Sequence, residues 1–278
     1  MSDAKPTAIV TGAASGIGRA IAIRLADLGY RLVLLDRDHD GLGKLQTALT
    51  SAGSCEHECV FTDVADGDAW RGFAETLAHD RADVALLVQA AGVLVAGRLV
   101  ECDVDDLQRL ISINLTGVLL GAQAVGPLLA QGAKNGGRPP LPRGVLNIAS
   151  IFGTVSPPGF AAYNASKAGV VALTETLRGE WEPLGLAATA VLPGITPTAL
   201  FDNAAYANDA LAATAKRRVA AAELTADSVA AAAIDAYRRR RLVVPIGKRA
   251  SRFFWLKRLL PGVLAKRVAA EAQRELGD

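Results

Sequence analysis

Three side chains with acid/base capacity occur at spacings that allow them to meet. Tyr163 and Lys167 are four residues apart within residues 161–182, which we expect to be helical, so they would lie one turn from each other on the same face. A lysine ammonium beside a phenol favours the phenolate and lowers the phenol's pKa from its ordinary value near ~10. Ser150 ends a predicted strand, and its hydroxyl could hydrogen-bond the same substrate oxygen. This combination indicates proton transfer at an alcohol or carbonyl oxygen.

A glycine-rich segment from Thr11 to Gly18, reading TGAASGIG, follows an apolar run and precedes a helical pattern. In such a turn the backbone N–H groups can approach a pyrophosphate, and the N-terminus of the helix adds partial positive charge. The spacing GxxxGxG alone is also compatible with an ordinary tight turn. Its place between a strand and a helix favours nucleotide binding.

An acidic residue, Asp36, ends the second predicted strand, 18 positions after Gly18. A carboxylate at this place can accept hydrogen bonds from both ribose hydroxyls of the adenosine half and repels a 2′-phosphate, which favours NAD. The guanidinium of the next residue, Arg37, could instead bind that phosphate, so NADP is the alternative. Asp36 could also serve only as a helix N-cap or turn residue.

Short β-branched or leucine-rich runs alternate with longer alanine-rich segments along the chain. Seven buried strands are predicted at residues 7–11, 31–36, 59–62, 84–89, 144–148, 187–192 and 242–245. Helices are predicted at residues 17–28, 42–52, 69–78, 104–130, 161–182 and 227–239. The alternation predicts an α/β, doubly wound (Rossmann) fold, with a seven-stranded parallel sheet and helices on both faces.

Two segments depart from this alternation. Residues 132–144 are turn-rich and are predicted to form an exposed loop. Residues 196–222 have a helical bias and stand where a substrate lid would lie, after the sixth strand. We therefore expect one dinucleotide-binding and catalytic domain over residues 1–245, which includes the lid, and a C-terminal extension over residues 246–278.

In their order along the chain, these motifs resemble those of the short-chain dehydrogenase/reductase family, whose hallmarks are a TGxxxGxG loop, a serine and a YxxxK helix. The resemblance extends from Thr11 to about Thr198. It includes the glycine-rich turn, Asp36, Asp63-Val64, Ala91-Gly92, Asn114, Ser150, Tyr163, Lys167 and Pro193-Gly194.

The resemblance implies a role for each of four catalytic residues. Tyr163 would be the general acid/base, Lys167 would hold the nicotinamide ribose and tune the tyrosine, Ser150 would position the substrate oxygen, and Asn114 would hold a water that links the lysine to solvent. The implied cofactor-binding residues are Gly12, Ser15, Gly16, Ile17, Gly18, Asp36, Arg37, Asp63, Val64, Ala90, Ala91, Gly92, Tyr163, Lys167, Pro193, Gly194 and Thr198.

One position departs from the family pattern, which has Asn-Asn-Ala-Gly after the fourth strand. Here the segment reads Gln89-Ala90-Ala91-Gly92. Gln89 keeps an amide on a longer side chain, and this change could loosen a hydrogen bond that stabilises the strand. Because all four catalytic residues are present, we expect activity to survive.

Composition sets outer limits on the function. The 278 residues are 51% hydrophobic and carry a formal charge of +2, which is typical of a globular protein and gives no overall argument for nucleic-acid binding. Cys55, Cys59 and Cys102 show no convincing metal-ligand spacing, so no metal site is predicted. The N-terminus lacks a signal-peptide pattern, and the apolar stretches near Val84 and Leu115 are interrupted. We therefore expect a cytoplasmic location without a membrane-spanning segment.

The expected substrate is a small hydrophobic alcohol or ketone, because few charged residues fall among the candidate cleft walls. These are Ile151, Phe152, Val155, Phe160, Leu200, Phe201 and Tyr206, any of which could instead be core. The resemblance also suggests a homodimer or homotetramer built by the helices that carry Asn114 and Tyr163. Gly117, Gly121, Ala168 and Ala172 would permit close helix packing there.

The C-terminal region is strongly basic. Residues 238–267 contain 11 Lys or Arg and no Asp or Glu, interleaved with aromatic residues and leucines. The segment could contact an anionic membrane surface peripherally, or its aromatic residues could pack over the cleft or a neighbouring subunit. No nucleic-acid-binding motif accompanies the charge. Besides a dehydrogenase, an NADPH-dependent ketone reductase and a non-catalytic cofactor sensor recruited to a membrane by this tail are the alternative functions.

Overall fold

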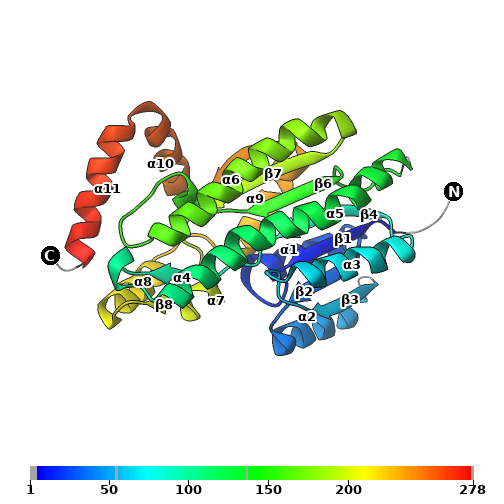
Figure 1. The fold of residues 1–278 in the computed structure, drawn as a ribbon, viewed down its shortest axis with the longest axis horizontal. Coiled ribbons are helices and arrows are strands. Elements are labelled where there is room, and N and C mark those ends of the chain that lie inside the picture. Colours follow the sequence, from blue (N-terminus) through cyan, green and yellow to red (C-terminus); the bar gives the residue numbers. More distant parts are fainter. Residues whose placement is uncertain (1–4, 54–55, 136, 277–278) are drawn as a thin grey trace.

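The computed structural model describes residues 5–53, 56–135 and 137–276. Its main sheet has seven strands in the order β3-β2-β1-β4-β6-β7-β9, and every neighbouring pair is parallel. The strands are β1 (Thr7–Thr11), β2 (Arg31–Asp36), β3 (His57–Phe61), β4 (Val84–Gln89), β6 (Gly144–Ile148), β7 (Ala187–Pro193) and β9 (Val243–Ile246). The predicted doubly wound α/β fold is confirmed (Figure 1).

The central strands are apolar because both of their faces are covered. All residues of β1, β4, β6 and β7 are buried, and side chains alternate between the two faces of a strand. Ala8 and Val10 of β1 therefore pack on one side, whereas Ile9 packs on the other. Each side of the sheet has its own hydrophobic core.

The helices divide between these two cores (Figure 1). Residues of α1 (Gly16–Asp27), α2 (His39–Ser51) and α9 (Ala226–Arg238) pack with Ala8 and Val10. Residues of α3 (Gly67–His79), α5 (Gly117–Lys134) and α6 (Ala161–Trp181) pack with Ile9. Helices α2 and α3 begin earlier than predicted because Asp38 and Asp66 cap them. The Asp38 carboxylate accepts a hydrogen bond from the backbone N–H of Gly41, and the Asp66 carboxylate accepts from those of Asp68 and Ala69.

The helix predicted over residues 104–130 is present but is not uniform. It consists of α4 (Val104–Ile111), a π-helical turn, η2 (Ser112–Thr116), and α5, which continues to Lys134 and so takes up the start of the predicted loop at residues 132–144. By length and composition alone, Val104–Lys134 would be long and apolar enough to cross a membrane, contrary to our expectation of interrupted stretches. In this fold α5 packs against β4 and α3.

Two glycines expected on an outer helix face are instead inside the subunit. Both Gly117 and Gly121 are buried. A Cβ on Gly117 would lie 2.8 Å from the backbone oxygen of Val64, and one on Gly121 would lie 2.9 Å from the Trp70 ring. These glycines allow α5 to approach its own domain, so they cannot serve a subunit contact. Ala168 and Ala172 are exposed on α6, as that expectation requires.

The lid segment is short and irregular. It contains α7 (Ala199–Asp202), β8 (Ala205–Tyr206) and α8 (Asp209–Ala220), and β8 pairs in parallel with β5 (Val95–Ala96). This two-stranded sheet fastens the lid to the segment that follows β4. Three short 3-10 turns, η1 (Leu99–Glu101), η3 (Ile151–Gly153) and η4 (Glu182–Leu184), complete the domain.

The C-terminal extension folds as two helices, α10 (Lys248–Leu259) and α11 (Pro261–Leu276). Ala250 and Phe254 of α10 and Leu264 of α11 are buried in one cluster with Ile151 of η3 and Leu192 of β7. The extension therefore shares a hydrophobic core with the main domain.

Candidate active site

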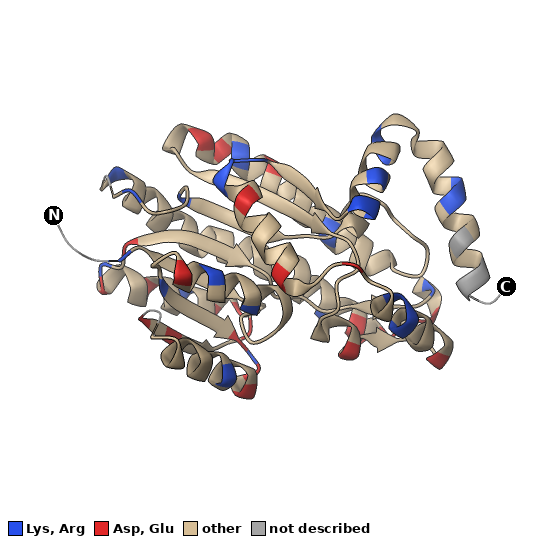
Figure 2. Cartoon of the chain, turned by 180° about the vertical axis from the view of Figure 1, so that it is seen from behind, with Lys and Arg blue, Asp and Glu red and all other residues tan. Residues whose placement is uncertain are grey.

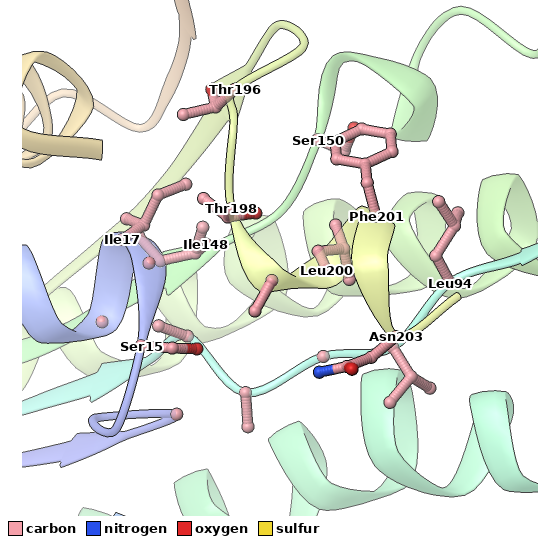
Figure 3. A pocket seen from close by; sticks show the side chains of 18 of the residues that line it. Ser15, Ile17, Leu94, Ile148, Ser150, Thr196, Thr198, Leu200, Phe201 and Asn203 are labelled. Carbon is pink, nitrogen blue, oxygen red and sulfur yellow. The ribbon is translucent and has the colours of Figure 1, made fainter. Parts of the chain in front are cut away.

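A cleft opens at the carboxyl ends of the central strands, where β1 and β4 lie side by side and the chain winds outward in both directions. Open α/β sheets bind their ligands at such a switch point. All predicted cofactor-binding residues line this cleft: Gly12, Ser15, Gly16, Ile17, Gly18, Asp36, Arg37, Asp63, Val64, Ala90, Ala91, Gly92, Tyr163, Lys167, Pro193, Gly194 and Thr198. Figure 3 shows side chains of the glycine-rich turn (Ser15, Ile17) and of the lid (Leu200, Phe201) around it.

The glycine-rich turn has a backbone that only glycine fits at two positions. Gly12 has φ +66°, and a Cβ there would lie 2.7 Å from the backbone nitrogen of Ala91. A Cβ on Gly18 would collide with the backbone oxygen of Gly12. The turn therefore presses against the end of β4 and leads directly into α1. This is the cradle that a dinucleotide pyrophosphate requires, with backbone N–H groups and a helix N-terminus beside the cleft.

The carboxylate of Asp36 is held at the end of β2 by two backbone groups. The N–H groups of Ala14 and Asp38 donate to its two oxygens at 2.9 Å and 3.0 Å. Asp36 is only partly buried, and the exposed Arg37 side chain lies next to it in the cleft wall. Both an acceptor for ribose hydroxyls and a cation are thus available where the adenosine half would lie.

Tyr163 and Ser150 meet at the base of the cleft. Tyr163 is buried, and this burial raises the pKa of its phenol to about 12, while a hydrogen bond with the Ser150 side chain acts to lower it. The Ser150 hydroxyl oxygen also accepts a hydrogen bond from the backbone N–H of Phe152 at 3.2 Å. The expectation of a lowered phenol pKa is therefore wrong, because the loss of hydration raises this pKa by more than the Ser150 hydrogen bond lowers it.

Lys167 lies one helical turn further along α6, as the spacing predicts. Its Nζ is 5.9 Å from the centre of the Tyr163 ring and donates a hydrogen bond to the backbone oxygen of Ile148 at 3.0 Å. Burial lowers the pKa of Lys167 to about 8. The Lys167 ammonium thus loses part of its hydration where it lies beside the phenol. This loss makes the protonation of Lys167 sensitive to pH near neutrality.

Asn114 lies behind the cleft and does not line it. Its side chain is fully buried in the π-helical turn. The amide oxygen accepts from the backbone N–H of Val93 at 2.8 Å, and the amide nitrogen donates to the backbone oxygen of Val93 at 2.9 Å. The amide nitrogen also donates to the Ser166 hydroxyl of α6 at 3.4 Å. Asn114 therefore joins the segment after β4 to α6, and Gly92 is small enough to fit between Asn114 and Lys167.

The amide of Gln89 is also satisfied despite its departure from the family pattern. It donates to the side-chain oxygen of Asn147 at 3.1 Å, and Asn147 in turn donates to the hydroxyl of Thr174 at 2.8 Å. This buried chain of hydrogen bonds joins β4, β6 and α6. The longer side chain thus ties the strands together rather than loosening them.

Most of the predicted substrate walls lie in the cleft, namely Ile151, Phe152, Phe160, Leu200 and Phe201. Val155 instead belongs to the core beside the C-terminal helices, and the hydroxyl of Tyr206 supports the lid by donating to the backbone oxygen of Phe201. Leu94, Asn203 and Arg218 also line the cleft, although no sequence pattern marks them. The pairing of β5 with β8 fixes the position of the lid. Because these strands are only two residues long, they leave no periodic pattern in the sequence.

A metal site finds no support in the described part of the chain, where no three His, Cys, Asp or Glu side chains are grouped to hold an ion. Cys59 and Cys102 are free thiols. Cys55 lies outside the described residues.

Comparisons with known proteins agree with this geometry. Residues 6–209 match the family model for short chain dehydrogenases. A 3-oxoacyl-[acyl-carrier-protein] reductase of Synechocystis is 33% identical over 196 residues, which is 70% of this chain and 76% of that protein. A short chain dehydrogenase/reductase from Burkholderia phymatum in complex with NAD superimposes with a TM-score of 0.82 at 29% identity, covering 93% of this chain and 94% of that one. One from Sphingobium yanoikuyae in complex with NADPH gives 0.75 at 29% identity over 94% and 95%.

Proposed function

This chain belongs to the short-chain dehydrogenase family and is an NAD(P)-dependent oxidoreductase of hydroxyl and carbonyl groups. From that premise we propose that its cofactor is NAD and its substrate a small hydrophobic secondary alcohol or the matching ketone. The observation that carries the proposal is the meeting of Ser150, Tyr163 and Lys167 in one cleft, between a glycine-rich turn and an apolar wall. We also propose a cytoplasmic location, which the free thiols of Cys59 and Cys102 support.

Each catalytic side chain has a defined role in this proposal. In the oxidation direction, the Tyr163 phenolate would accept the proton of the substrate hydroxyl. The nicotinamide cofactor, held by the residues that line the cleft, would supply the redox chemistry as the hydride acceptor. The Ser150 hydroxyl hydrogen-bonds the substrate oxygen and keeps it within reach of the phenol. The Lys167 ammonium binds the nicotinamide ribose and favours the phenolate electrostatically. Asn114 positions the Val93 backbone on which this arrangement rests.

The proposed substrate class follows from the lining of the cleft. Phe152, Phe160 and Tyr163 form a cluster of rings, with centroid distances of 5.1 Å and 6.3 Å from Phe152. Leu200 and Phe201 of the lid pack against the same cluster. An apolar carbon skeleton would displace water from these surfaces, whereas a substrate with several charges would lose its hydration there.

Replacement of Tyr163 by Phe tests the proposed chemistry. Wild-type protein should reduce NAD in the presence of hydrophobic secondary alcohols, and Tyr163→Phe should lower kcat by roughly 100-fold to 10,000-fold, because it removes the acid/base group. Its affinity for NADH, measured by fluorescence titration, should remain close to that of the wild type. Retained turnover in Tyr163→Phe would contradict the assignment of the phenol.

Equilibrium binding of NADH and NADPH tests the choice of cofactor. Because the Asp36 carboxylate is held in the cleft, we expect NADH to bind at least about tenfold more tightly, a difference of about 1.4 kcal/mol. Asp36→Ser should remove most of this preference, whereas Asp40→Ser on the exposed surface of α2 should not. Tighter binding of NADPH by the wild type would mean that Arg37 dominates and that the enzyme is a ketone reductase.

A further inference from the structure

The two C-terminal helices form a hairpin whose turn exposes apolar side chains. We call residues 248–276 the basic hairpin. At and near its turn, Leu259 is 74% exposed, Val263 57%, Trp255 56% and Leu260 52%. Single exposed leucines are common, but here four large apolar side chains within nine residues are each more than half exposed. Figure 1 shows the hairpin at one end of the molecule, beyond the sheet.

The apolar turn is surrounded by positive charge. Residues 248–267 contain seven Lys or Arg residues and no Asp or Glu: Lys248, Arg249, Arg252, Lys257, Arg258, Lys266 and Arg267. Figure 2 shows these blue segments on both helices of the hairpin. The guanidinium of Arg258 stacks 4.3 Å from the centre of the Phe254 ring, which holds a charge beside the turn.

The hairpin has an inner and an outer face. Phe254 and Leu264 are buried in the core that they share with Ile151 of η3 and Leu192 of β7. The exposed residues follow the helical repeat on the other face, with Arg252, Trp255 and Leu259 along α10 and Val263, Lys266 and Arg267 along α11. The inner face is thus covered by the core. The outer face is both basic and apolar, and the residues named on it are exposed to solvent.

We propose that the basic hairpin binds an anionic membrane surface, with the Leu259–Val263 turn inserted among the lipids and the lysines and arginines on their headgroups. Helices that bind at membrane interfaces have this combination: apolar side chains insert among the lipids, and basic side chains beside them contact the anionic headgroups. A second copy of the chain meeting this face around a two-fold axis would place positive charge against positive charge. Nucleic acid would engage the charges but give the aliphatic turn no favourable contact.

This placement has a consequence for the cleft. Helix α10 packs against η3, which carries the substrate wall at Ile151 and Phe152, and α11 packs against lid helix α8. A hairpin held at a bilayer therefore keeps the lid close to the lipid surface. A hydrophobic substrate dissolved in the membrane would then have a short path to the cleft.

Tryptophan fluorescence offers a direct test, because Trp255 is exposed whereas Trp70 and Trp181 are only 3% and 9% exposed. Full-length protein is mixed with vesicles of phosphatidylcholine alone or of an equal mixture with phosphatidylglycerol. We expect a blue shift of the emission and co-sedimentation with the anionic vesicles only, both weakened by salt. Trp255→Phe should sediment similarly and lose the shift.

Two sets of variants separate insertion from charge. Leu259→Ser with Val263→Ser, and Lys266→Gln with Arg267→Gln, should each weaken vesicle binding by roughly tenfold or more. The matched controls, Val100→Ser with Leu184→Ser and Lys44→Gln with Arg81→Gln, replace exposed side chains elsewhere and should leave binding unchanged. Unaltered thermal unfolding and NADH affinity would show that the hairpin variants fold.

Four results would overturn the proposal. They are no sedimentation of the wild type with anionic vesicles at low salt, an unshifted Trp255, equal loss of binding in the controls, and a hairpin variant that changes the oligomeric state without altering vesicle binding. Tighter binding to duplex DNA than to vesicles at the same salt would equally assign the charge to another partner. None of these outcomes depends on turnover.

Discussion

At the scale of single residues, the acid/base site depends on burial as much as on the choice of side chains. Enclosure raises the phenol pKa of Tyr163 to about 12 and lowers the ammonium pKa of Lys167 to about 8. Both shifts disfavour the charged form of the group, as low hydration requires. The spacing of the two residues predicts their proximity, but it could not predict these directions, because burial depends on neighbours from β6 and η3 that are distant in sequence.

The lowered pKa of Lys167 makes a prediction about stability. Between about pH 8 and its ordinary pKa of 10.5, the unfolded chain holds a proton on this lysine that the folded chain has released, so this group makes the unfolding free energy rise with pH across that window. Below pH 8 both states are protonated and the full cost of the buried charge remains. Lys167→Met should therefore be more stable than wild type at pH 7, by at most about 3 kcal/mol.

Urea unfolding of both proteins at pH 7 and pH 10 checks this prediction. The difference in unfolding free energy between the variant and the wild type cancels the contributions of other groups that titrate in this range, such as Tyr30. We expect the advantage of Lys167→Met to shrink by pH 10, and the variant to lose turnover. An advantage that is equal at both pH values would show that Lys167 carries no penalty from burial.

At the scale of elements, strands proved easier to predict than the pieces that complete the site. Strands β1, β4, β6 and β7 are buried along their whole length because both of their faces are covered. A strand of this kind can be predicted from its apolar sequence alone. The π-helical turn at Ser112–Thr116 carries the buried Asn114, and such a single turn leaves no periodic pattern in the sequence. The position of the lid likewise depends on the pairing of β5 with β8, which are two residues long. The sequence therefore could not predict that Arg218 lines the cleft.

At the scale of the whole molecule, the outer surface of α6 is where we expect a second subunit to bind. Ala165, Ala168 and Ala172 are exposed on one face of this helix, and Leu119 on α5 is 45% exposed. Small side chains let two helices approach closely. A two-fold contact would bring the same face of α6 in each subunit together, on the helix that also carries Tyr163.

We therefore expect the protein in solution to have the mass of a dimer or a multiple of it. Replacing both Ala168 and Ala172 by Arg should lower that mass, because two long charged side chains on each subunit would keep the helices apart and would lose hydration if buried. Light scattering across a range of concentrations checks this. The matched control is Ala52→Arg at the exposed end of α2, on the other side of the sheet. A wild-type mass of one chain at every concentration, or a mass unchanged by the α6 variant, would move the contact elsewhere.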